Sequence, residues 1–220
     1  MRKMKCFLGF AFFLGVFTLS LSAQSRVLTK AEYDALTKEA FAKTAKRVRR
    51  EITEDRSYAA GVLTEEEVTT QEFLPPDKEK WLIVNRSGDT TTRTEIVYLG
   101  RREYRRENSG PWKKIGRDDP KNKFTIVGDI NSAKAIEVVT YSLEDRNAAG
   151  ATVRVLFEKS NLAYGFSPGL QTRRITLDKD GHILKIEDSV SEPTPDEVVY
   201  TSVQTVDYSP KGIRIEPPIK

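Results

Sequence analysis

Two apolar runs with a turn between them decide the fold: KWLIVNRSGDTTTRTEIVYL, residues 80–99. Residues 80–86 and 93–99 are rich in β-branched and aromatic residues, and Ser87-Gly88-Asp89 between them is a turn signal. Strands joined by so short a turn pair in antiparallel fashion, because a parallel pair needs a long crossover. The stretch therefore predicts a β-hairpin.

The same pattern continues over most of the chain, with Gly-, Pro-, Asn- and Asp-rich turns between short runs of period two. Besides the hairpin above, the candidate strands are residues 58–63, 67–73, 103–106, 112–115, 134–144, 152–159, 172–177, 183–190, 198–207 and 212–216. Strands at this spacing predict a long antiparallel meander, and hence a mainly β protein of the α+β class.

An amphipathic helix precedes the strands. Thr29 and Glu32 match a capping box, in which the hydroxyl and the carboxylate each satisfy a free backbone NH. Apolar residues then recur at three- and four-residue spacing: Tyr33, Leu36, Ala40, Phe41, Ala45, Val48 and Ile52. We expect this N-terminal helix to pack its apolar face on the sheet, although a basic amphipathic helix can also lie on an anionic membrane.

The strands differ in the number of their apolar faces. Residues 152–158 alternate, with Val153, Val155 and Phe157 on one face and polar residues opposite, which predicts one solvated face. Residues 81–84 and residues 96–99 are apolar on both faces. One helix covers only part of one side, so the remaining apolar surface either closes on itself, as in a barrel, or lines a cavity for an apolar ligand.

The first 23 residues have the layout of a secretory signal peptide. Arg2, Lys3 and Lys5 precede a charge-free apolar run over residues 6–21, and small residues follow. The run is shorter than the roughly 20 residues that span a bilayer. We predict a signal peptide over residues 1–23, with Ser25 as the alternative cleavage point, and a single domain over residues 24–220. The mature protein is expected to be soluble, unlipidated and periplasmic, or else extracellular.

The composition limits the chemistry of the mature chain. Its 33 basic and 32 acidic residues are interspersed, so the basic isoelectric point of the full chain does not indicate nucleic-acid binding. The only cysteine, Cys6, lies in the signal segment, so no disulfide is expected. The only histidine, His182, excludes the usual triads and histidine-rich zinc sites. No pair of carboxylates is singled out, and we predict a protein that is not an enzyme and needs no cofactor.

Two further motifs have functional and structural interpretations. Asp178-Lys179-Asp180-Gly181 lacks the remaining ligands of a calcium loop and is interpreted as a hairpin turn without metal. Four arginines between residues 101 and 106 flank Tyr104, and Trp112 follows, which could suggest stacking on bases or sugars. Packing of the two aromatic side chains within the sheet is the favoured interpretation.

The order of these motifs resembles a known superfamily. The segments concerned are FLPPD (residues 73–77), IVYLGRREY (96–104), PWKK (111–114), LDKDG (177–181) and IRIEPP (213–218). They resemble exported lipoprotein and lipid carriers of the LolA and LppX type, over roughly residues 29–218. The resemblance implies an incompletely closed antiparallel barrel with a helix packed on it, and an apolar interior for acyl chains or lipidated protein termini.

The implied function is that of a non-enzymatic carrier. Its partners would be lipid acyl chains or a lipidated protein, with transient membrane contact as an option, no nucleic acid, and a monomeric state. The candidate lining residues, chosen by strand parity, are Trp81, Ile83, Ile96, Tyr98, Val153, Val155, Phe157, Ile175 and Leu177.

One feature departs from this family. Its carriers have further helices that form a lid, and here only residues 118–132 could supply one, with few apolar positions at helical spacing. Without a lid the half-barrel could be filled by its own side chains. The alternative function is therefore a periplasmic interaction or sensor module with a filled core that binds another envelope protein.

Overall fold

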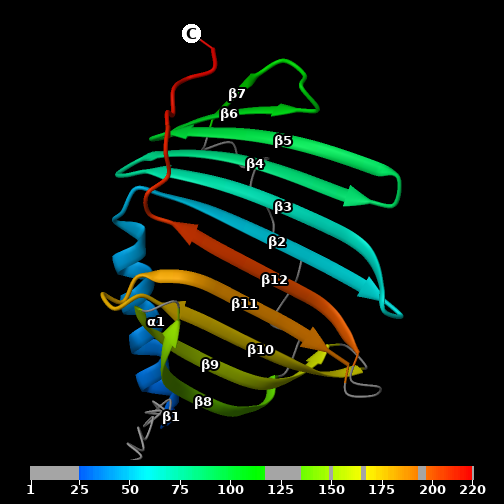
Figure 1. Cartoon of the computed structure of the whole chain (residues 1–220). Coiled ribbons are helices and arrows are strands. Elements are labelled where there is room, and N and C mark those ends of the chain that lie inside the picture. The colour runs from blue at the N-terminus through cyan, green and yellow to red at the C-terminus, as the bar shows by residue number, and fades with distance from the viewer. Residues whose placement is uncertain (1–24, 117–134, 149–150, 165–166, 193–196, 220) are drawn as a thin grey trace, which may run out of the picture.

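A computed structural model describes residues 25–116, 135–148, 151–164, 167–192 and 197–219 (Figure 1). The described elements are β1 (Ser25–Leu28), α1 (Lys30–Ala45), β2 (Arg49–Ala59), β3 (Val62–Leu74), β4 (Lys78–Ser87), β5 (Thr90–Leu99), β6 (Arg102–Glu107), β7 (Lys113–Gly116), β8 (Ala135–Ala148), β9 (Ala151–Tyr164), β10 (Ser167–Leu177), β11 (Ile183–Ser191) and β12 (Val198–Asp207). The predicted lid segment, residues 118–132, and the predicted signal peptide lie outside the described residues.

All the described strands belong to one antiparallel sheet, in the order β1-β8-β9-β10-β11-β12-β2-β3-β4-β5-β6-β7. Its edge strands, β1 and β7, lie at opposite ends of this order, so the sheet stays open as an incomplete barrel. The predicted fold class is confirmed. The prediction of one meander is wrong in detail, because two meanders, β2 to β7 and β8 to β12, are joined by the pairing of β12 with β2.

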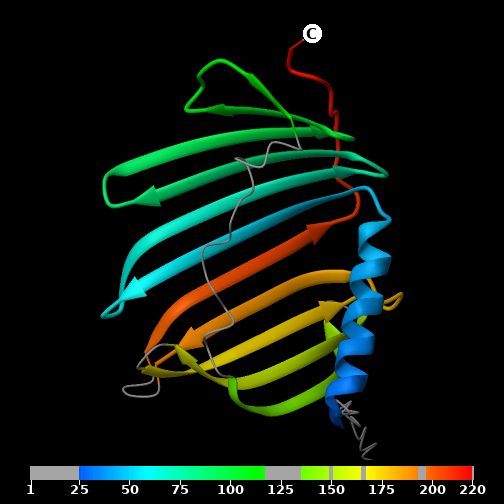
Figure 2. The same cartoon turned by 180° about the vertical axis from the view of Figure 1, so that it is seen from behind.

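Helix α1 crosses one end of the sheet and packs on β8 and β11 (Figure 2). We call the side of the sheet that it covers the helix face, and the other side the outer face. The core beneath the helix is a cluster of buried side chains: Leu28, Tyr33, Ala40, Tyr141, Leu156, Ile175, Leu177, Ile183 and Ile186. Because its members come from α1 and from strands β1 and β8 to β11, this cluster fixes the helix to that part of the sheet. No described helix has the length and hydropathy of a membrane-crossing segment.

The start of α1 is as predicted, and its end is not. Thr29 is the N-cap, and the capping box with Glu32 is complete. The helix ends at Ala45, so the predicted apolar stripe does not continue through Val48 to Ile52. Ile52 lies in β2, whose backbone pairs with β3 and β12, and Phe41 is 46% exposed. Pairing on both sides of β2 thus overrides the helical spacing of the side chains.

Two predicted strands are also wrong. Residues 58–63 include the turn between β2 and β3, where Ala60 and Gly61 have φ angles of 50° and 72°. Residues 212–216 form no strand, but Ile215 is buried on the outer face against Val97 and Tyr104. The tail therefore covers the outer side of β5 and β6. For β5, whose residues 96–99 are apolar on both faces, this agrees with the prediction that both faces are covered.

The predicted solvated face of β9 is partly core. Leu156 shares the helix face with Arg154 and Glu158 and is fully buried under α1, while Val155 on the outer face is 4% exposed. The strand is therefore buried on both faces at its middle, a feature that alternation alone does not reveal.

The last turn of α1 is attached to the sheet through Thr44. Its Oγ1 accepts a hydrogen bond from the backbone NH of Ile183 at 3.0 Å and lies 3.0 Å from the Tyr208 hydroxyl. Tyr208 donates to the carbonyl of Ile183 at 2.7 Å, so Thr44 is left to donate to Tyr208. The ammonium of Lys43 adds a 3.0 Å bond to the carbonyl of Asp180.

Replacing Thr44 by valine, which has nearly the same shape, is expected to destabilise the protein by about 1–3 kcal/mol, because the buried NH of Ile183 loses its acceptor. Urea unfolding measures the loss. Thr44→Ser keeps the hydroxyl and should lie closer to the wild type. Equal stability of the valine variant and the wild type would contradict this role.

Candidate functional site

The candidate lining residues lie on two different faces. Directly paired residues on neighbouring strands point to the same side, and one such row runs Ile83, Thr69, Thr53, Gln204, Ile186, Ile175, Leu156 and Leu143. Trp81, Ile83, Ile96, Tyr98, Ile175 and Leu177 therefore share the helix face. Val153, Val155 and Phe157 are on the outer face, so they cannot line the same surface as the other six.

The helix-face candidates form two separate groups. Ile175 and Leu177 are 1% and 5% exposed and belong to the core beneath α1. The other four lie on β4 and β5, at least four strands from β11 in the order of the sheet. We call this second group the aromatic patch: Trp81, Ile83, Ile96 and Tyr98. Only the aromatic patch lies away from the strands on which the helix packs.

The aromatic patch is fixed in place but incompletely buried. Trp81 and Ile96 are direct cross-strand partners, and the Trp81 and Tyr98 rings meet edge to face with centroids 5.7 Å apart. The indole NH of Trp81 donates to the Glu79 carboxylate at 3.2 Å. Ile96 is buried, whereas Trp81, Ile83 and Tyr98 are half-buried. The pairing positions a rigid apolar surface that keeps some contact with solvent.

A polar belt separates the two apolar regions of the helix face. Arg49 and Glu51 form a buried ion pair, and Gln204 of β12 donates to Glu51 at 2.8 Å. Tyr200 of β12 donates to Asp55 of β2 at 2.6 Å. Burial, and then the bond to Asp55, raises the pKa of Tyr200 to about 12. The bonds from Gln204 to Glu51 and from Tyr200 to Asp55 cross the junction of the two meanders.

Arg49 also connects the belt to the neighbouring elements. Its guanidinium lies 3.7 Å from the centre of the Phe73 ring and donates to the carbonyl of Ala45, the last residue of α1, and to that of Arg47 just beyond the helix. Sequence analysis missed the belt. The pattern that could have predicted the belt is the polar residue at every second position of residues 49–55 and 67–71. These polar residues share one face of the sheet.

Pockets lined by described residues lie at three places. One of about 280 Å³ lies at the β6–β7 hairpin, beside Arg105, Pro111 and Lys113. Another, of about 200 Å³, lies between the end of α1 and the polar belt, and one of about 130 Å³ lies between α1 and the β10–β11 turn. Ligand pockets typically measure about 300–1,000 Å³. None of these three pockets is lined by a residue of the aromatic patch.

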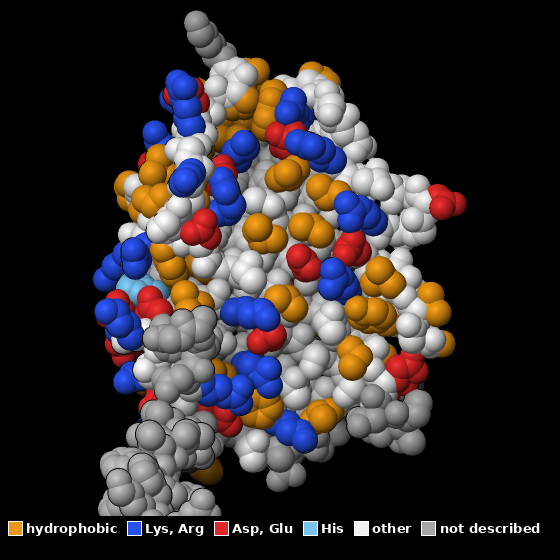
Figure 3. All heavy atoms as spheres, viewed as in Figure 1, with side chains coloured by type: hydrophobic (Ala, Val, Ile, Leu, Met, Phe, Trp, Pro, Cys, Tyr) orange, Lys and Arg blue, Asp and Glu red, His pale blue; other side chains and the backbone are white. Residues whose placement is uncertain are grey.

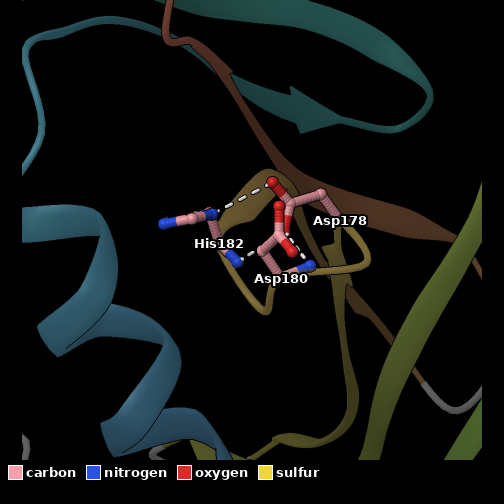
Figure 4. Close-up of side chains that lie close together, drawn as sticks. All are labelled: Asp178, Asp180 and His182. Atoms are coloured by element: carbon pink, nitrogen blue, oxygen red, sulfur yellow. Dashed lines mark hydrogen bonds and ion pairs between the residues drawn. The ribbon is translucent and has the colours of Figure 1, made fainter.

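The β10–β11 turn holds a cluster of titratable groups in which ligand atoms of Asp178, Asp180 and His182 lie within 4.8 Å of one another (Figure 4). Asp178 Oδ1 accepts from the backbone NH groups of Asp180 and His182, at 2.9 and 2.8 Å, and Oδ2 lies 3.1 Å from His182 Nδ1. Burial alone would raise the pKa of Asp178, but these hydrogen bonds together hold it below its ordinary value. The carboxylate thus serves to fix a turn that contacts α1.

The outer face is covered by mixed charges (Figure 3). Glu66 of β3 contacts Arg56 of β2 and Arg86 of β4, at 3.1 and 2.7 Å. Glu95 of β5 contacts Arg93 and Arg106 in the same way. The Glu66 pairs are those of a partly solvated sheet surface, whereas Glu95 is buried between its two arginines.

No protein-family model matches the chain, and no curated protein matches it. Several solved structures are similar to it, and two of them are described here. LprF from Mycobacterium bovis has 8% sequence identity and a TM-score of 0.43, over 89% of this chain and 100% of that one. An outer membrane lipoprotein-sorting protein domain from Vibrio parahaemolyticus has 11% identity and a TM-score of 0.30, over 84% and 93%.

Removing the charge of Glu51 should be costly, because Arg49 would remain buried without its counter-ion. Glu51→Gln is expected to lose about 3 kcal/mol in urea unfolding, the lower end of the range for breaking a buried pair. Glu54→Gln, on the solvated outer face, should cost far less. Replacing Arg49 and Glu51 together by methionine should recover part of the loss, and a wild-type stability of Glu51→Gln would refute the role of the belt.

Asp178 should contribute stability that depends on pH. Because its pKa is lowered by folding, the contribution is present above the unfolded pKa of about 3.9 and is lost as the pH falls through the folded value. Asp178→Asn should therefore be less stable than the wild type at pH 7, and the difference should shrink below about pH 4. Urea unfolding at several pH values checks this, and a gap that does not change with pH would speak against it.

Proposed function

We propose that the protein is an exported, non-enzymatic carrier that holds a lipid acyl chain, or the lipidated end of a protein, against the aromatic patch. The observation that carries this proposal is the position of Trp81, Ile83 and Tyr98, which are half-buried on the helix face of an open sheet. Helix α1 packs on the opposite half of that sheet. Export would follow from the predicted signal peptide, residues 1–23.

The binding energy would come from burial. Each methylene group transferred from water to an apolar surface contributes about 0.8 kcal/mol, and aromatic side chains offer large, rigid contact areas. The ring planes of Trp81 and Tyr98 make an angle of 72°, and both rings lie on the same side of the sheet, where an acyl chain could pack against them. Transfer of such a ligand between membranes needs no group that makes or breaks a bond.

The polar belt favours a second candidate, the interaction module with a filled core. Arg49, Glu51 and Thr69 are all less than 9% exposed, so the middle of the helix face is filled by polar side chains. A ligand would therefore be confined to the part of the sheet beyond the belt. If even this part binds no lipid, recognition of another envelope protein is the function to pursue.

The test is native mass spectrometry of residues 24–220, produced in a bacterial periplasm, before and after organic extraction. A carrier should show a mass excess of several hundred daltons that disappears on extraction, with acyl chains or phospholipid in the extract. A bare mass, together with no binding of a fluorescent fatty acid, would overturn the carrier proposal in favour of the interaction module.

A matched pair of variants locates the ligand. Ile83 and Leu82 are adjacent half-buried residues of β4 that point to the helix face and the outer face, respectively. Ile83→Thr should reduce the bound lipid, whereas Leu82→Thr should keep it at a similar cost in stability. Equal lipid content in the two variants would place the ligand elsewhere.

A further inference from the structure

The β6–β7 hairpin, residues 101–116, concentrates positive charge at one edge of the sheet. It contains six basic and two acidic residues, a net charge of +4. The mature chain expected after residue 23 has a net charge of +1, so its other residues together carry −3. The strand at this edge, β7, includes Lys113 and Lys114.

Four of the six cations are exposed and have no acidic partner among the described residues: Arg101, Arg102, Lys113 and Lys114. The remaining two are engaged. Arg105 contacts Glu107 at 2.9 Å, and Arg106 contacts both Glu95, at 2.7 Å, and the Trp112 ring. This differs from the neighbouring outer face, where arginines alternate with glutamates, and an unbalanced cluster of this kind attracts an extended anionic surface.

One cation of the cluster, Lys113, lies on the same face as the aromatic patch, whereas Arg102 and Lys114 pair with Leu99 and Tyr104 and point to the outer face. On the helix face, Trp81 pairs with Ile96, Ile96 with Arg105, and Arg105 with Lys113. Neighbouring strands are about 4.8 Å apart, so Lys113 lies two strands from the patch. An amphiphile whose chain lay on the patch could place its charged head beside Arg105 and Lys113, with Arg102 and Lys114 facing the membrane from the other side of the same edge.

We propose that this basic hairpin docks the protein on an anionic phospholipid membrane, where lysine and arginine side chains contact lipid phosphates and the aromatic patch lies beside the bilayer surface. The inference rests on the proposed carrier function, because the patch supplies the reason for membrane contact. Arginine and lysine both bind phosphate oxygens, and each cation near an anionic bilayer strengthens binding severalfold. Lysines on an edge strand also hinder unwanted strand pairing, and a role limited to that predicts no membrane binding.

The test is sedimentation of the mature protein with vesicles of phosphatidylcholine alone or with added phosphatidylglycerol. The protein should bind only the anionic vesicles, and binding should weaken as salt is added. Lys113→Gln with Lys114→Gln should weaken binding roughly 10- to 30-fold. The control pair, Lys38→Gln with Lys179→Gln, removes the same charge from exposed positions elsewhere and should have little effect.

Absence of binding to the anionic vesicles, as expected if the hairpin instead meets an acidic protein surface, would overturn the proposal. Equal weakening by both pairs, or no weakening by Lys113→Gln with Lys114→Gln, would also overturn it. Native mass spectrometry distinguishes a failure of membrane docking from a failure of the carrier function. The hairpin variant should keep its bound lipid, whereas Ile83→Thr should lose lipid and still dock. A protein that docks without lipid would retain the hairpin's role and contradict the carrier.

Discussion

The pairing of β12 with β2 is the constraint on which the rest of the structure depends. It joins the last strand of one meander to the first strand of the other, so that two small open sheets become one long one. The bonds from Gln204 to Glu51 and from Tyr200 to Asp55 reinforce this junction on the helix face. A charge buried at such a place is stable only while its partner and hydrogen bonds are present, so the polar belt also specifies which strands meet.

The junction divides the helix face into two apolar regions with different surroundings. On one side, α1 covers the residues around Leu156 and Ile175 and closes the main core. On the other side, Trp81 and Tyr98 stay half-buried on strands that lie beyond the belt. A half-barrel with one filled end and one accessible end follows from this division. The proposed carrier function uses this second end, where a ligand would bury apolar side chains that the protein leaves half-buried.

Local chemistry made much of the fold predictable. The capping box at Thr29, the turns at Gly88 and Gly181, and the period of two identified the helix start and most hairpins. What could not be predicted was long-range pairing. Nothing in residues 49–59 indicates that β12 is their neighbour, so the apolar spacing through Val48 and Ile52 predicts a helix that continues into the first residues of β2.

Because long-range strand pairing could not be predicted, the candidate site was predicted only in part. Parity within a strand correctly grouped Trp81 with Ile83, and Ile96 with Tyr98, because each pair is two residues apart. Parity could not relate β9 to β4 across the sheet, since that depends on the register of every strand between them. Val153, Val155 and Phe157 were therefore grouped with a surface that they do not share, and the polar belt was not foreseen.

Ligand binding at the aromatic patch is tested most directly with the two tryptophans of the chain, which lie on opposite faces of the sheet. Trp81 belongs to the aromatic patch, and Trp112 packs in the outer-face cluster around Ile215. Trp112→Phe leaves only Trp81 as a tryptophan reporter, and Trp81→Phe leaves only Trp112. A fatty acid brominated along its chain should quench the fluorescence of Trp81 in the first variant and leave Trp112 in the second almost unchanged. Equal quenching in both variants, or quenching of Trp112 alone, would contradict binding at the aromatic patch.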